Sequence, residues 1–234
     1  MFKQSKQTFL IMEKFKVLNL YACLGGNRYK WDEVAKQANI DMEVTAVELD
    51  QELAKLYQER FPNDNVVVAD AHQYLLDHYQ EFDFIWSSPP CPTHSRMRKI
   101  NTGEGEKKSK ATYPDMKLYQ EILLLEHFFK GKYCVENVIP FYKPLIPAKK
   151  RDRHLYWTNF NLPNDLNGRK VSNFIKSKVS DLSDFHDYDF RKYKGNQRVD
   201  KIARNLVDYE AGRKIFETAL NITRSNNIQQ SKLF

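Results

Sequence analysis

Short apolar runs alternate with helical stretches along the first 138 residues of this chain. Each run has the length of a buried strand, and apolar residues recur at helical spacing in the stretches between them. Strands that alternate with helices in this way predict a parallel sheet with right-handed crossovers, and therefore an α/β fold. The predicted strands are residues 15–20, 43–47, 65–69, 82–86 and 133–135; the predicted helices include residues 31–38, 51–61, 74–79 and 116–129. Periodicity fades from residue 160 to 199, and a helical pattern returns over residues 201–220.

Polar side chains stand at the ends of successive predicted strands. Because parallel strands end at one edge of the sheet, these side chains are expected to gather where open α/β sheets bind ligands. They are Asn19, Glu48, Asp70, Cys91 and Glu136.

The segment Pro89-Pro90-Cys91 carries a thiol on a loop stiffened by two prolines, and Glu136-Asn137-Val138 ends another strand. A thiol nucleophile beside an acid suits addition to an unreactive aromatic ring. Cys23 and Cys134 lie in apolar surroundings and are interpreted as ordinary packed cysteines. With no Cys-x-x-Cys pair, a zinc site is not expected.

Composition limits the class of protein. At 234 residues the chain suits one sizeable core, and its net charge of +7 favours a polyanionic partner such as nucleic acid. No apolar run approaches the roughly 20 residues that a membrane-spanning helix needs, and no signal peptide is evident. We therefore expect a cytoplasmic protein without a membrane partner.

A second group of features points to an adenosine ligand. The turn after the first strand contains Gly25 and Gly26, which let the backbone approach a ligand. Glu48 at the next strand end is placed to accept hydrogen bonds from ribose hydroxyls, and Asp70 from an adenine amino group. These residues alone do not separate NAD from S-adenosylmethionine.

Together these segments resemble the cytosine-5 DNA methyltransferases, and the resemblance covers residues 17–220. Residues 19–26 stand in the place of the family's glycine segment, Pro89-Pro90-Cys91 in that of its nucleophile loop, and Glu136-Asn137-Val138 matches unchanged. Residues 149–153 resemble its two-arginine stretch, and residues 204–207 its Gly-Asn-x-Val segment. The resemblance implies a Rossmann-like S-adenosylmethionine-dependent methyltransferase fold, a mostly parallel central sheet with helices on both faces. It also implies S-adenosylmethionine as cofactor, S-adenosylhomocysteine as product, and no metal.

The resemblance assigns roles residue by residue. The thiolate would be Cys91, Glu136 would hold the base edge, and Arg153 the base oxygen, with Arg151 supporting the loop. Cofactor contacts would come from Asn19, Tyr21, Ala22, Gly25, Gly26, Glu48, Leu49, Asp70, Ala71, Pro89, Asn205 and Val207. Nucleic-acid contacts would come from Ser95, Lys107, Lys108, Lys110, Lys149 and Lys150, three of these lysines lying in a predicted mobile lid after Cys91.

The chain departs from the family in having little room for target recognition. We expect an N-terminal extension (1–14), a catalytic domain (15–160), a reduced recognition region (161–200), a C-terminal helix completing the catalytic domain (201–223) and a tail (224–234). The expected partner is double-stranded DNA, with a second subunit or a homodimer able to supply recognition. A bacterial or phage setting, and a restriction-modification role, would suit such an enzyme.

Other functions remain open at this point. The same chemistry could act on RNA, as in the tRNA-acting members of the family. The chain could also bind nucleic acid without turnover. An NAD-dependent oxidoreductase is a further alternative, although it leaves Pro-Pro-Cys and Glu-Asn-Val unexplained.

Overall fold

The computed structural model describes residues 14–96, 113–166, 169 and 176–222. Within them, one seven-stranded sheet has the order β3-β2-β1-β4-β5-β7-β6. β1 to β5 run parallel, and β7 lies antiparallel between β5 and β6. The strands are β1 (Phe15–Leu20), β2 (Met42–Glu48), β3 (Asn65–Val68), β4 (Phe84–Ser87), β5 (Lys132–Val138), β6 (Lys149–Arg151) and β7 (His154–Thr158).

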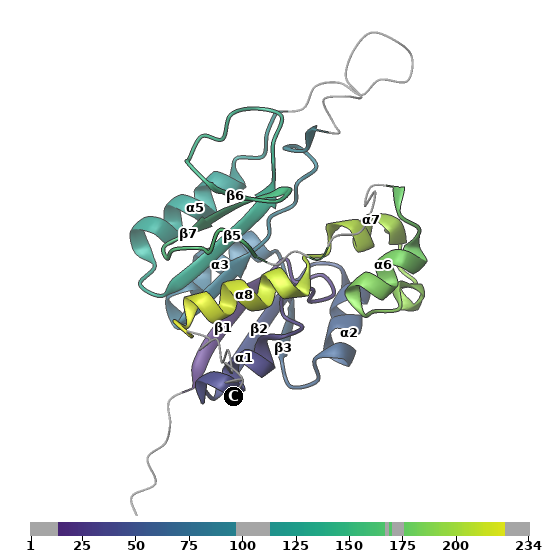
Figure 1. Ribbon diagram of the computed structural model, residues 1–234, viewed down its shortest axis with the longest axis horizontal. Helices are drawn as coiled ribbons and strands as arrows, with labels where there is room; N and C mark the ends of the chain where they lie inside the picture. The colour runs from purple at the N-terminus through teal and green to yellow at the C-terminus, as the bar shows by residue number, and fades with distance from the viewer. Residues whose placement is uncertain (1–13, 97–112, 167–168, 170–175, 223–234) are drawn as a thin grey trace, which may run out of the picture.

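Helices cover both faces of this sheet (Figure 1). One face packs on α1 and α8 through a core that includes Trp31, Phe84 and Phe216. The other face packs on α3 and α5 through Leu75 and Ile122. The helices are α1 (Trp31–Ala38), α2 (Gln51–Arg60), α3 (Ala71–His78), α5 (Lys117–Phe128), α6 (Val179–His186), α7 (Val199–Asn205) and α8 (Tyr209–Ala219), with 3-10 turns η1 (Tyr79–Glu81) and η3 (Phe190–Lys192).

This architecture confirms the predicted fold class, a Rossmann-like α/β fold with a mostly parallel central sheet and helices on both faces. The five predicted strands and four predicted helical stretches all form, with ends that shift by a few residues. Cys134 is fully buried in the core, as the interpretation of a packed cysteine requires. No helix in the described part of the chain has the length and apolar character of a membrane span.

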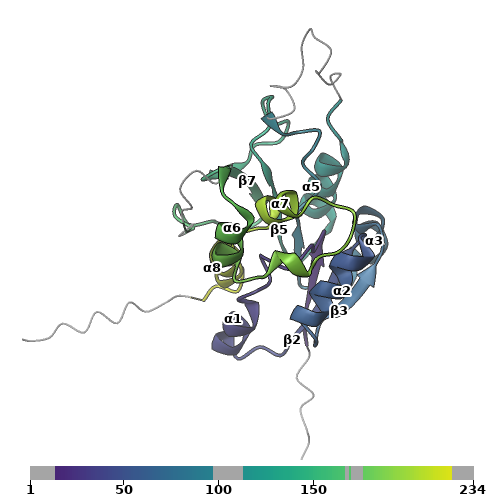
Figure 2. The same cartoon turned by 90° about the vertical axis from the view of Figure 1, so that its right-hand side faces the viewer.

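The segment from residue 160 to 199, where the periodicity fades, contains a helix. It contains α6, which packs with α7 against α2 through Leu182, Phe190, Ile202, Leu53 and Leu56. Figure 2 shows α6 and α7 together on the side of the molecule that carries α2. The described part of this segment therefore shares a core with the sheet domain.

The helical pattern of residues 201–220 forms two helices, so the expectation of one C-terminal helix was wrong. α7 ends at Asn205, and extended backbone at Leu206 and Asp208 separates it from α8. The Asp208 side chain accepts a hydrogen bond from the Glu210 backbone and so starts α8 as its N-cap. The break brings residues 205–207 to the turn after β1.

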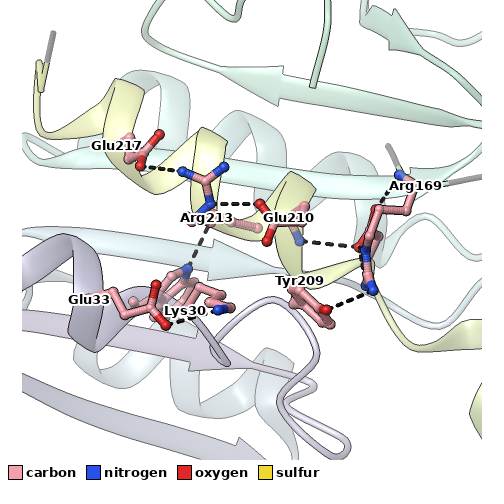
Figure 3. Close-up of polar contacts among 10 residues, drawn as sticks. Lys30, Glu33, Arg169, Tyr209, Glu210, Arg213 and Glu217 are labelled. Carbon is pink, nitrogen blue, oxygen red and sulfur yellow. Dashed lines mark hydrogen bonds and ion pairs between the residues drawn. The ribbon is translucent and has the colours of Figure 1, made fainter. Parts of the chain in front are cut away.

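Polar contacts stabilise α8 along its length and at its start (Figure 3). Arg213 pairs with Glu210 at 2.7 Å and with Glu217 at 2.6 Å along the helix. Arg169 pairs with Asp208 at 2.8 Å and lies over the Tyr209 ring at 3.6 Å from its centroid. These contacts hold the start of α8, and with it the break before α8, in place.

Candidate active site

A cavity of about 1120 Å³ opens at the carboxyl ends of the parallel strands, with residues 197–207 forming its far wall. This is the sheet edge at which the strand-end side chains were expected to meet. The predicted site residues that line it are Cys91, Glu136, Arg153, Asn19, Tyr21, Ala22, Glu48, Leu49, Asp70, Ala71, Pro89, Ser95, Asn205 and Val207. Residues far apart in sequence therefore share one space.

Other predicted residues lie elsewhere. Arg151, Lys149 and Lys150 are on the short edge strand β6, and Gly25 and Gly26 are behind the cavity wall. Lys107, Lys108 and Lys110, with the predicted lid, fall outside the described residues.

The side chains of Lys149 and Arg151 already have protein partners. Lys149 Nζ donates to the hydroxyl and carbonyl of Thr158 and to the Phe160 carbonyl. Arg151 donates to the carbonyls of Pro163 and Leu162. These bonds tie β6 to the chain after β7, which leaves Lys150 as the exposed cation of the strand.

Gly25 and Gly26 serve close packing. A Cβ at Gly25, where φ is +66°, would lie 2.3 Å from the Phe61 ring, and one at Gly26 would lie 2.3 Å from the Val207 carbonyl oxygen. The absence of side chains lets α2 and the α7–α8 break press against the turn after β1. The glycines thus shape the cavity through their neighbours.

One part of the cavity is lined by Glu48. Its two carboxylate oxygens accept hydrogen bonds from the backbone nitrogens of Cys23 and Asp50, at 2.8 and 2.9 Å. Burial raises the pKa of Glu48, and these backbone bonds act in the opposite direction. The carboxylate is thereby fixed between two strand ends, where it can accept bonds from a diol.

Asp70 begins α3 as its N-cap, accepting from the Gln73 nitrogen at 2.9 Å, and Lys117 lies 3.7 Å from its other oxygen. That bond to Gln73 is the main reason that the pKa of Asp70 is lowered. Its side chain is half exposed, so the oxygen facing Lys117 remains accessible to a ligand.

Asn19 and Tyr21, predicted as cofactor contacts, line the cavity and also have side-chain partners in the protein. The buried Asn19 accepts a 2.8 Å hydrogen bond from Asn27. Tyr21, in the left-handed region with φ of 56°, donates to the buried Glu121 carboxylate at 2.6 Å. Glu121 belongs to no sequence motif. Its contact with Tyr21 is seen only in the structure, where α5 packs behind the site.

The Cys91 loop is held at several points. Asn137 Nδ2 donates to the Pro89 carbonyl oxygen at 2.9 Å, and Ser95 forms an isolated antiparallel bridge with Pro140. The backbone nitrogen of Ser95 also donates to the Cys91 carbonyl oxygen at 3.0 Å. The loop that carries the thiol is therefore anchored to the strand that carries Glu136.

Charges around the thiol act in both directions. Burial, and then Glu136, raise the pKa of Cys91, whereas Lys201 and Arg153 lower it. Lys201 comes from α7 and lines the cavity, a role that no motif in the sequence suggested. Binding of a further anion or loss of either cation would change the fraction of thiolate.

Burial also raises the pKa of Glu136 to about 7, while a hydrogen bond from Ser88 and the charge of Arg153 act in the opposite direction. Near neutral pH a substantial part of this group is protonated, so it can donate a proton to a ring nitrogen. Ser88 itself accepts a 2.8 Å bond from the Trp86 ring nitrogen, which orients its hydroxyl.

A sequence profile of the C-5 cytosine-specific DNA methylase family matches residues 15–138, more than half of the chain. The chain belongs to this family. The match spans both halves of the cavity, from β1 through the Cys91 loop to the Glu136 strand. S-adenosylmethionine is therefore its cofactor, and the chemistry of Glu48 and Asp70 at the strand ends fits the ribose and adenine of that molecule.

Solved structures give weaker likenesses. DNMT2 from Spodoptera frugiperda is 24% identical with a TM-score of 0.35, over 53% of this chain and 36% of that one. TrmN from Thermus thermophilus is 15% identical with a TM-score of 0.38, over 62% of this chain and 43% of that one. A hypothetical protein from the same organism is 17% identical with a TM-score of 0.38, over 62% of this chain and 74% of that one. The chain thus aligns with about a third of DNMT2, and no curated protein matches its sequence.

Proposed function

We propose that this protein transfers a methyl group from S-adenosylmethionine to carbon 5 of cytosine in double-stranded DNA. The observation that carries the proposal is the shared cavity: Cys91, Glu136 and Arg153 line it together with Glu48 and Asp70. A nucleophile, an acid and a guanidinium thus adjoin a nucleoside-binding wall. A cavity of about 1120 Å³ is ample for a nucleoside and a flipped pyrimidine together.

The chemistry assigns one task to each side chain. The thiolate of Cys91 adds to carbon 6 of the ring, which makes carbon 5 nucleophilic. Glu136 donates a proton to ring nitrogen 3, and Arg153 stabilises the negative charge on the base oxygen. When bound, S-adenosylmethionine supplies the electrophilic methyl group. Loss of the carbon 5 proton to solvent then expels Cys91 as a thiolate, and ring nitrogen 3 returns its proton to Glu136, which restores the aromatic ring.

The cytosine must leave the base stack to reach this cavity, at a cost of a few kcal/mol. Cations at the substrate side would offset that cost by contacting the DNA backbone. Lys201 and Arg96 line the cavity mouth beside Arg153, and we assign phosphate contacts to them together with Ser95 and the exposed Lys150. Such contacts make binding weaker as salt increases.

The same proposal assigns a role to each region of the chain. Residues 15–160 and 201–223 carry the catalytic machinery, and residues 161–200 serve as a reduced recognition region. Because this region is short, a second subunit or a second copy of the chain supplies further recognition of the target.

The test is transfer of labelled methyl groups to duplex DNA, single-stranded DNA and tRNA, followed by base-resolution mapping of 5-methylcytosine. Label in duplex DNA that disappears with Cys91→Ser supports the proposal. Label confined to tRNA would reassign the substrate. If the protein bound cofactor and DNA but transferred no labelled methyl group, it would be a binding protein. Hydride transfer with NAD would identify an oxidoreductase.

A further inference from the structure

The carboxyl group of Glu136 has a close neighbour that no motif identified. His154 Nε2 lies 3.5 Å from Glu136 Oε1, and His154 also lines the cavity. The two side chains are well shielded, with exposed fractions of 18% and 9%. A polar pair of this kind inside a reaction cavity is a candidate for function beyond packing.

The strand pairing explains why they meet. In the antiparallel β5–β7 pair, Glu136 stands opposite Tyr156 and Val138 opposite His154. His154 and Glu136 therefore project from the same face of the sheet as diagonal neighbours, within reach of long side chains. Asp152, where φ is +47°, lies in the β6–β7 turn directly before β7.

The ring of His154 is uncharged. Burial, followed by the nearby charge of Arg153, lowers the pKa of His154 to about 3. At neutral pH the contact is therefore no ion pair, and the ring can offer Glu136 one N–H donor without adding a positive charge to the site.

Several groups surround the Glu136 carboxyl group, and a second hydrogen-bond donor would fix its orientation. Ser88 donates to the carboxyl group from the loop after β4, and Arg153 lies near it from the β6–β7 turn. Cys91 and Lys201 of α7 line the same cavity, and the charges of Glu136 and Lys201 both act on the Cys91 thiol. Tyr156 is the direct partner of Glu136 on β7. A second donor from His154 would fix the carboxyl plane and decide which oxygen faces the substrate.

We infer that His154 is a positioning residue for Glu136: its ring donates Nε2–H toward Oε1 already in the free protein, and the contact tightens when a pyrimidine is bound, so that the other oxygen presents its proton to ring nitrogen 3. The present separation is slightly longer than a hydrogen bond, and catalytic contacts of this kind shorten in the substrate complex. The inference rests on the proposed function for the identity of the base, but the contact itself exists without substrate.

Two variants isolate the donor. His154→Gln keeps an N–H near the place of Nε2, whereas His154→Leu fills the space without a donor. The Leu variant should lower kcat about 10- to 100-fold, with KM for S-adenosylmethionine unchanged. The Gln variant should stay within about threefold of wild type. Equal kcat values for Leu and wild type would overturn the inference.

A second measurement does not depend on turnover. Carbon-13 NMR of glutamate-labelled protein, with Glu136→Gln to assign the signal, follows the titration of this carboxyl group. A neutral donor favours the ionised form, so the proton affinity of Glu136 should rise about threefold or more in His154→Leu and stay unchanged in His154→Gln. Identical titrations in all three proteins would refute the contact, even if no nucleic-acid substrate had been found. An altered titration in a protein without methyl transfer would instead leave the contact intact and reject the proposed function.

Discussion

The side-chain amide of Asn137 donates a 2.9 Å hydrogen bond to the carbonyl oxygen of Pro89, which ties strand β5 to the loop that carries Cys91. The same asparagine accepts a bond from the Val138 nitrogen, so its orientation is fixed. Glu136 and Cys91 thus occupy two segments that are joined directly.

Replacing Asn137 by Ala should therefore loosen the thiol loop. We expect kcat to fall about 10- to 100-fold and the free energy of unfolding to fall by about 1–3 kcal/mol, because the buried Pro89 carbonyl loses its donor. Affinity for S-adenosylhomocysteine, measured by calorimetry, should change little.

The matched control is Asn159→Ala. Asn159 makes the same kind of bond to the Gly131 carbonyl oxygen, at 2.8 Å, but at the opposite end of β5. Asn159→Ala should lower the free energy of unfolding and leave kcat close to that of wild type. Equal losses of kcat in both variants would contradict a specific role for Asn137.

Glu48→Ala should weaken cofactor binding. The variant removes a carboxylate held by two backbone nitrogens, and with it the acceptor proposed for the ribose hydroxyls. Loss of hydrogen bonds to a charged group predicts a dissociation constant for S-adenosylhomocysteine about 10- to 100-fold higher. Isothermal calorimetry measures it, with the exposed Glu59→Ala on α2 as control. An unchanged affinity in Glu48→Ala would remove the ribose assignment.

The buried pair Arg28–Asp64 should dominate the stability of the β1–α1 connection. The guanidinium makes two bonds to the carboxylate, at 2.8 and 2.9 Å, and Tyr57 donates a third at 2.9 Å. Asp64→Asn leaves the buried Arg28 with the largely exposed Asp32, 2.8 Å away, as its remaining carboxylate partner, and should cost about 3 kcal/mol in urea unfolding. Glu33→Gln breaks the exposed pair with Lys30 (Figure 3) and should leave the midpoint unchanged. Similar midpoints for the two variants would contradict this account.

The raised pKa of Glu136 should be visible in the pH dependence of the free energy of unfolding. The pKa of Glu136 in the folded protein is about 7, above the ordinary value of 4.5. Between pH 4.5 and pH 7 the folded protein therefore keeps a proton on this group that the unfolded chain has released. The unfolding free energy should therefore fall as pH rises from about 4.5 through about 7, by about 3 kcal/mol from this group. Glu136→Gln removes this contribution and should be more stable than wild type at pH 8, although inactive. A variant that is no more stable than wild type at pH 8 would show that the pKa is not raised.

Much of the fold could be predicted from the sequence because its signals are local. Strands β1 to β5 are short apolar runs, and polar residues at their ends necessarily meet at one edge of a parallel sheet. Cys91, Glu136, Glu48 and Asp70 were found in this way. α6 was missed because only Leu182 and His186 of its residues are buried, too few to show a helical period.

Other parts of the site depend on contacts that no local pattern encodes. Lys149 and Arg151 look like free cations in sequence, yet in the structure they donate to backbone carbonyls. His154 reaches Glu136 through the antiparallel register of β5 and β7. Lys201 lines the cavity because it belongs to α7, whose Ile202 packs with Leu53 and Leu56 of α2. These arrangements are tertiary, and the structure is needed to see them.

The central claim is that the sulfur of Cys91 forms a bond with carbon 6 of a flipped cytosine. It is tested most directly with duplex DNA containing 5-fluorocytosine, whose fluorine cannot leave as a cation, so that the adduct cannot be released after methyl transfer. Incubation with S-adenosylmethionine followed by peptide mass spectrometry should show the methylated nucleotide on Cys91 and on neither Cys23 nor Cys134. Methylation of ordinary cytosine DNA with no adduct on Cys91 would contradict the account.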